Sequence, residues 1–110
     1  MKLFLGDVSD YSVEQLVDWV AREFCVDKGN LERYQFLVAS VNEYSYDGSS
    51  YFLVKDRETG DYYEVSADHC SCMGYEEQWE PKIASKVYLQ SPQYQSGWKE
   101  VQSFVRMLFN

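Results

Sequence analysis

The chain has 110 residues, of which 45% are apolar, 17% aromatic and 25% charged, and its formal net charge is −8. The negative charge argues against direct binding to nucleic acid, which requires lysines and arginines at the phosphates, and against binding to anionic membranes. No apolar run approaches the roughly 20 residues that span a bilayer, and three cysteines cannot form a complete disulfide framework. The length suits one domain, so we expect a single domain over residues 1–110 in a reducing cytoplasm.

Residues 12–25 predict an amphipathic helix. Ser12 followed by Gln15 fits a capping box, in which each side chain bonds the other's backbone. Apolar side chains recur at helical spacing on one face. These are Val13, Leu16, Val17, Val20 and Phe24.

Three strands are predicted at residues 33–46, 50–56 and 61–66. The first of them carries apolar side chains on both of its faces. Asp47 and Gly48 mark the turn after it, because this dipeptide favours tight hairpins. Strands that lie close in sequence and are joined by short turns favour an antiparallel meander.

The C-terminal third holds one ambiguous segment and one helix. Residues 83–89 fit either a fourth strand or a short helix, and Val87 favours the strand. Residues 97–109 predict an amphipathic helix with Ser96 as its candidate cap. We therefore predict an α+β fold: an antiparallel three- to four-stranded sheet, with an N-terminal and a C-terminal helix packed on one face.

The segment "DHCSCMGYEEQW", residues 68–79, concentrates the chemistry of the chain. His69, Cys70 and Cys72 are competent zinc ligands, and Cys25 is a candidate for the fourth position. Structural zinc sites normally place two to four residues between paired cysteines, whereas one residue separates this pair. A zinc site is therefore the alternative prediction for this loop, and no other cofactor is predicted.

Other interpretations of this loop are also open. A Cys-x-Cys pair can close a strained, labile disulfide. A cysteine nucleophile needs a histidine beside it in space, and neighbours in sequence rarely provide that geometry. The favoured interpretation is structural: the cysteines pack as small apolar groups, Gly74 helps the bend and Trp79 packs back on the sheet. We expect no enzyme.

Charge is distributed unevenly along the chain. Residues 1–81 hold 17 acidic and 6 basic side chains, a net charge of −11, whereas residues 82–110 carry +3. Complementary charge speeds encounter between proteins, so this balance favours a partner with a basic surface. The predicted partner-binding residues are Asp56, Glu58, Asp61, Asp68, Tyr75, Glu76 and Glu77.

The run "YYEVSADHCSCMGYEEQWEP", Tyr62 to Pro81, resembles a segment of small, uncharacterised proteins of tailed bacteriophages and prophages. The matching residues are Val65, His69, Cys70, Ser71, Cys72, Gly74, Glu76, Gln78 and Trp79. The resemblance covers about twenty residues of the 110 and carries no assigned chemistry. It implies a phage-type accessory protein of the bacterial cytoplasm, and many such proteins are small and acidic and bind a host protein.

These observations lead to one functional hypothesis and one alternative. The hypothesis is a non-enzymatic binding module that occludes a basic surface of a bacterial host protein, as an inhibitor or a nucleic-acid mimic. The charges would steer association, and aromatic side chains would anchor it. The alternative is a zinc-binding module that uses the His-Cys-Ser-Cys loop.

Overall fold

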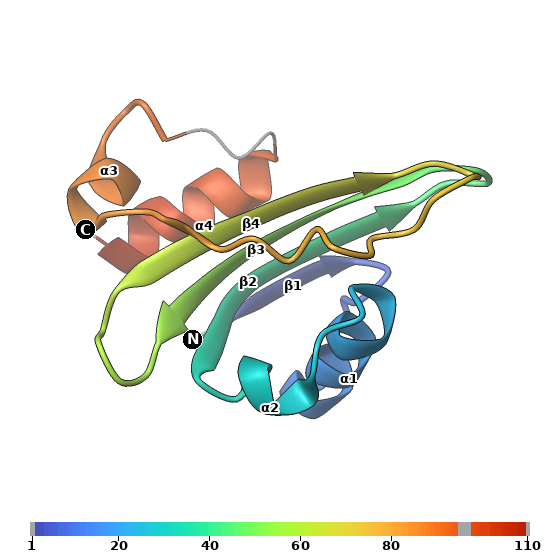
Figure 1. The fold of residues 1–110 in the computed structure, drawn as a ribbon. Helices are drawn as coiled ribbons and strands as arrows, with labels where there is room; N and C mark the ends of the chain where they lie inside the picture. Colours follow the sequence, from blue (N-terminus) through green and yellow to red (C-terminus); the bar gives the residue numbers. More distant parts are fainter. Residues whose placement is uncertain (1, 95–97, 110) are drawn as a thin grey trace.

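The computed structural model describes residues 2–94 and 98–109, and it shows an α+β fold (Figure 1). Within these residues a five-stranded sheet has the order β1-β2-β3-β4-β5, and four helices accompany it. In chain order the elements are β1 (Leu3–Gly6), α1 (Val13–Glu23), α2 (Lys28–Leu31), β2 (Tyr34–Glu43), β3 (Gly48–Asp56), β4 (Tyr62–His69), β5 (Lys82–Ile83), α3 (Lys86–Gln90) and α4 (Lys99–Phe109).

The predicted meander is confirmed for β2, β3 and β4, which pair antiparallel in sequence order, and β5 extends it. A purely antiparallel sheet was the wrong prediction, because β1 pairs parallel with β2, from Leu3 opposite Val38 to Gly6 opposite Val41. The chain reaches β2 from β1 through α1 and α2. Such a crossover returns the chain in the same direction and makes the two strands parallel.

Helix α1 begins as its sequence predicts. The Ser12 hydroxyl accepts from the Gln15 backbone amide at 3.1 Å, and the Gln15 side chain accepts from the Ser12 amide at 2.8 Å. This capping box satisfies two donors that the first turn leaves without helical partners. The helix ends at Glu23 with Phe24 as its C-cap, and Cys25 follows with a φ of 54°.

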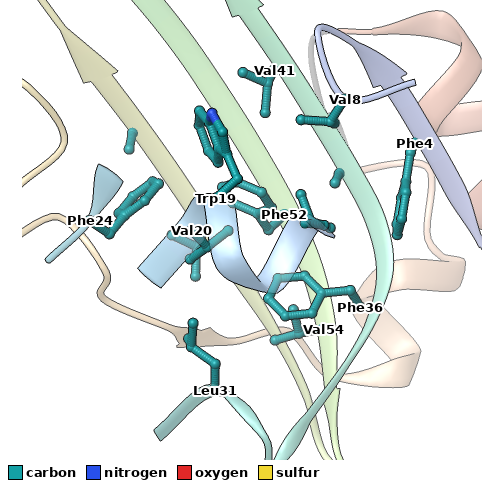
Figure 2. Packing of buried hydrophobic residues seen from close by; sticks show 14 of the residues in the cluster. Phe4, Val8, Trp19, Val20, Phe24, Leu31, Phe36, Val41, Phe52 and Val54 are labelled. Carbon is teal, nitrogen blue, oxygen red and sulfur yellow. The ribbon is translucent and has the colours of Figure 1, made fainter. Parts of the chain in front are cut away.

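One face of the sheet carries an aromatic core beneath α1 and α2 (Figures 1 and 2). The Phe24 ring from the end of α1 meets Phe52 of β3 edge-on at 5.8 Å. Trp79 also packs on this face, with ring centroids 5.7 Å from both Phe24 and Phe52, as predicted. The fully or nearly buried members are Phe4, Val8, Leu16, Trp19, Val20, Phe24, Leu31, Phe36, Ala39, Val41, Phe52, Val54, Val65, Ala67 and Tyr75.

The other face carries a second core beneath α3 and α4. It consists of Leu37, Val38, Tyr51, Leu53, Ala84, Leu89, Tyr94, Val101, Val105 and Phe109. Helices α1 and α4 therefore cover opposite faces of the sheet (Figure 1), and the prediction that both pack on one face is wrong. The reason is the alternation along β3: Phe52 and Val54 face α1, while Tyr51 and Leu53 face α4.

A β-bulge lets β2 contribute to both cores. Phe36 pairs with Val54 and Val38 pairs with Leu53, so Leu37 is an extra residue without its own partner on β3. Leu37 and Val38 both join the α4-side core, whereas Phe36 and Ala39 join the α1-side core. The bulge therefore interrupts the alternation of side chains along β2, so that Phe36 and Ala39, which are three positions apart, face the same helix layer.

The ambiguous segment at residues 83–89 contains both kinds of structure. Ile83 ends the two-residue strand β5, and the strand preference around Val87 was wrong because that residue lies in α3. The Ser85 hydroxyl caps this helix by accepting from the Tyr88 amide at 3.1 Å. The predicted closing helix is confirmed over α4, while its candidate cap Ser96 lies outside the described residues.

Candidate functional site

The predicted partner-binding residues lie at two opposite ends of the sheet. Asp56 ends β3, and Glu58 and Asp61 lie in the turn between β3 and β4, whereas Asp68, Glu76 and Glu77 lie at or beyond the other end of β4. Strand β3, which joins the two ends, has nine residues and spans about 26 Å at a rise near 3.3 Å per residue. One contact surface therefore cannot use the whole predicted set.

Asp56 is a structural residue and is not accessible to a partner. Its side chain is fully buried, and one carboxylate oxygen accepts from Arg33 Nε at 3.1 Å and from Nη2 at 2.5 Å. The other oxygen accepts from the Glu58 and Thr59 amides at 2.8 and 3.3 Å. The Arg33 guanidinium holds the pKa of this carboxyl below its usual value. Asp56 thus fixes the β3–β4 turn, and its predicted role in binding is wrong.

Tyr75 is also buried, with 1% of its surface exposed. Its ring stacks on Phe24 at a centroid distance of 4.9 Å and an interplanar angle of 8°, and meets Trp19 at 5.9 Å. Burial raises the pKa of its hydroxyl. The side chain fills the space between the end of α1 and the loop after β4, so its predicted role as a surface anchor is wrong.

Two turns lie at the same end of the sheet, and we call them together the hairpin tip: residues 43–48, which join β2 to β3, and residues 68–73, at the end of β4 (Figure 1). Glu43, Gly48 and His69 are neighbours across three strands, because Glu43 pairs with Gly48 and Gly48 pairs with His69. This register brings a carboxylate and an imidazole together over a glycine.

Glu43 and His69 form an ion pair across the hairpin tip. The Glu43 carboxylate lies 2.5 Å from His69 Nε2, and this contact raises the pKa of the imidazole. A Cβ at Gly48 would overlap the Glu43 carboxylate and would lie 2.7 Å from His69 Nε2. Only glycine leaves room for the pair. The imidazole is therefore engaged by a carboxylate, while its Nδ1 lies 3.2 Å from the Cys70 carbonyl oxygen.

The cysteine pair occupies a tight turn directly after His69. Cys70 and Met73 form an isolated antiparallel bridge, with the Cys70 amide 3.2 Å from the Met73 carbonyl. The Cys70 and Cys72 sulfurs are 2.8 Å apart. Both thiols are free and exposed, so the prediction that these cysteines pack as small apolar groups is wrong. The Cys72 thiol lowers the pKa of Cys70 by hydrogen bonding, and the same contact raises the pKa of Cys72.

The structure does not bring the four predicted zinc ligands together. Two thiolates on tetrahedral zinc, at about 2.3 Å from the metal, lie about 3.8 Å apart, which is well beyond the separation of Cys70 and Cys72. His69 is held by Glu43, and Cys25 lies at the end of α1 with its sulfur 3.9 Å from the Arg22 carbonyl. Among residues 2–94 and 98–109, no group of three or more His, Cys, Asp or Glu side chains is placed to hold a metal ion.

Gln78 holds the loop that follows the cysteine turn. Its side-chain oxygen accepts from the Asp68 amide at 3.1 Å, and its nitrogen donates to the Asp68 carbonyl at 2.7 Å. The same nitrogen donates to the Gly74 carbonyl at 3.1 Å. One side chain thus ties the loop to the end of β4. Glu76 and Glu77 remain exposed on the outside of the loop.

The hairpin tip exposes three large apolar or aromatic side chains: Tyr44, Tyr46 and Met73 are 65%, 76% and 65% exposed. Tyr44 lines a shallow cavity of about 210 Å³, and Asp47 and His69 contribute to its walls. Sequence reasoning missed the two tyrosines, although their place beside the predicted Asp-Gly turn was a usable sign, because turns lie on the surface.

Comparisons of the chain with protein-family models, with curated proteins and with solved structures found no match. Within the described part of the chain, no helix has both the length and the apolar character needed to cross a membrane.

Proposed function

We propose that this chain is a non-enzymatic binding module that covers a basic surface of a bacterial protein with its hairpin tip. It would act as an inhibitor or as a mimic of nucleic acid. Its origin as a phage-type accessory protein of the bacterial cytoplasm is part of this proposal and depends on the resemblance of residues 62–81.

The observation that carries the proposal is the exposure of Tyr44, Tyr46 and Met73 on adjacent turns. Tyrosine supplies a large contact area at a low entropic cost and is enriched among residues that dominate binding energies. Methionine adapts to irregular partner surfaces. A folded domain gains little by leaving such side chains in water, so this grouping supports a surface for a protein partner.

The charge around these side chains supports a basic partner. Asp47 and Asp68 are exposed in the hairpin tip, and Glu76 and Glu77 are exposed in the adjoining loop. Among the basic side chains, Arg33 is already paired with the buried Asp56 at the other end of the sheet. Carboxylates that surround aromatic anchors accelerate encounter with a basic surface and make binding sensitive to salt.

The experiment compares two variants that remove the same charge from opposite ends of the sheet. The tip variant carries Asp47→Asn and Asp68→Asn, and the control carries Glu58→Gln and Asp61→Asn. Each immobilised protein is used to capture partners from bacterial lysate at low and high salt. We expect the wild type and the control to retain the same basic protein at low salt, and the tip variant to lose it.

A third variant tests the anchors. Replacing Tyr44 and Tyr46 by alanine is expected to weaken capture at low salt by at least tenfold, because loss of one hot-spot side chain typically costs about 2 kcal/mol or more. Circular dichroism of every variant confirms that the fold is retained. The proposal would be refuted if the tip variant and its control lost the captured protein equally. It would also be refuted if the wild type captured no basic protein in a salt-sensitive way.

A further inference from the structure

We propose that Cys70 and Cys72 form a redox site that reacts with small disulfides and closes reversibly to an intramolecular disulfide. This inference does not depend on the proposed binding function. It rests on the position of the two sulfurs, on their exposure and on the turn that holds them.

The geometry favours a disulfide over a chelate. The sulfurs are 2.8 Å apart, between the 2.05 Å or so of a covalent S–S bond and the roughly 3.8 Å of two thiolates on tetrahedral zinc. The bridge between Cys70 and Met73 keeps the turn closed, so Cys72 stays beside Cys70. Closing the bond requires a small movement of two side chains at the surface.

The two cysteines have different roles in the reaction. Cys70 is the attacking group, since hydrogen bonds from the Cys72 thiol and from the backbone of Cys72 and Met73 stabilise its thiolate and lower its pKa. Cys72 is the resolving group, because its sulfur lies 2.8 Å from that of Cys70. Both ring nitrogens of His69 are engaged, Nε2 by the Glu43 carboxylate and Nδ1 by the Cys70 carbonyl oxygen, so the imidazole takes no part as a base for Cys70.

The reaction proceeds in two exchanges. The Cys70 thiolate attacks one sulfur of a disulfide RSSR and forms a mixed disulfide, while the other half leaves as a thiolate. Cys72 loses its proton to solvent and attacks the Cys70 sulfur, which forms the Cys70–Cys72 bond and expels the second thiolate. The protein loses two electrons and two protons, and RSSR is reduced to two molecules of RSH.

The test exposes the folded protein to oxidised glutathione near neutral pH, followed by alkylation of the remaining thiols and mass spectrometry. The wild type is expected to lose two hydrogen atoms, with the new bond between Cys70 and Cys72. Dithiothreitol is expected to reverse the change. In Cys72→Ser the reaction should stop at a glutathione adduct on Cys70. Cys25→Ser should close as the wild type does.

Two further measurements separate this site from its alternatives. A synthetic peptide of residues 68–79 is expected to close several-fold more slowly than the protein, because the folded turn holds the sulfurs together. Treatment with a chelator should leave the rate unchanged. A stable glutathione adduct on wild-type Cys70, faster reaction at Cys25 than at Cys70, or a rate that rises after chelation would each overturn the inference.

Discussion

The burial of Tyr75 predicts a sharp difference between two substitutions of one side chain. Tyr75→Ala removes a ring that stacks on Phe24 and is 1% exposed. Burying roughly 150 Å² of apolar ring surface at about 25 cal/mol per Å² contributes about 4 kcal/mol to stability. With the cavity that the substitution leaves, the free energy of unfolding should fall by about 3–5 kcal/mol. Such a loss is a large share of the 5–15 kcal/mol or so that stabilises a domain. The melting temperature should fall by roughly 10–30 °C.

Tyr75→Phe keeps the ring and removes a buried hydroxyl that lies near the Ser50 hydroxyl, and neither of the two makes a hydrogen bond of good geometry among the described residues. Its free energy of unfolding should therefore equal or exceed that of the wild type. Urea denaturation followed by circular dichroism measures both variants, with Tyr46→Ala as the exposed control at less than about 0.5 kcal/mol. A loss below about 1 kcal/mol for Tyr75→Ala would refute the assignment of this ring to the core.

The remaining predictions concern two of the ion pairs, Glu43 with His69 and Arg33 with Asp56. Gly48→Ala should lower the free energy of unfolding by about 1 kcal/mol, since the new Cβ meets the ends of two side chains that can move. The substitution should separate Glu43 from His69, so the His69 pKa measured by NMR titration should fall. Because pairing raises the His69 pKa above the ordinary 6.5, the pair should stabilise the fold below pH 6.5 or so and lose that contribution as pH rises through the raised pKa. Glu43→Gln should abolish this pH dependence, and an unchanged profile would contradict the pairing. Arg33→Ala should lower the urea midpoint at pH 7 by leaving the Asp56 carboxylate buried without its cation. Because the Asp56 pKa is lowered, pairing with Arg33 should stabilise the wild-type fold near neutral pH, and this stabilisation should disappear as pH falls through the lowered pKa. The urea midpoints of the wild type and of Arg33→Ala should therefore converge at low pH.

Local features of the fold were readable from the sequence where neighbouring residues determine them. The capping box at Ser12, the hairpin at the Asp-Gly turn and the three-stranded meander depend on contacts within a few residues or across a short turn. Strand β1 was missed because its pairing with β2 spans 35 positions, as from Leu3 to Val38, and no local pattern encodes it.

The arrangement of the helices was partly visible but misinterpreted. The sequence shows apolar side chains on both faces of β2, and β3 is apolar throughout residues 51–54, which is typical of a sheet that is covered on both sides. The bulge at Leu37 then decides which residues of β2 face which helix layer, and a bulge has no clear mark in composition or periodicity.

The candidate site was predicted less well because charge and aromaticity do not reveal burial. Asp56 and Tyr75 have residue types that suit a surface, yet one pairs with Arg33 and the other stacks on Phe24. Both partners are distant in sequence. The structural interpretation of the cysteine loop is confirmed for Trp79, whose apolar ring packs on the sheet, and is wrong for Cys70 and Cys72, which are exposed instead of packing as small apolar groups.

Strand β3 has helices on both of its sides and neighbouring strands on both of its edges. A truncated protein that ends near residue 81 would therefore leave Tyr51 and Leu53 in contact with water. The N-terminal and C-terminal layers thus depend on the same central strand, because each one shields an opposite face of it from water.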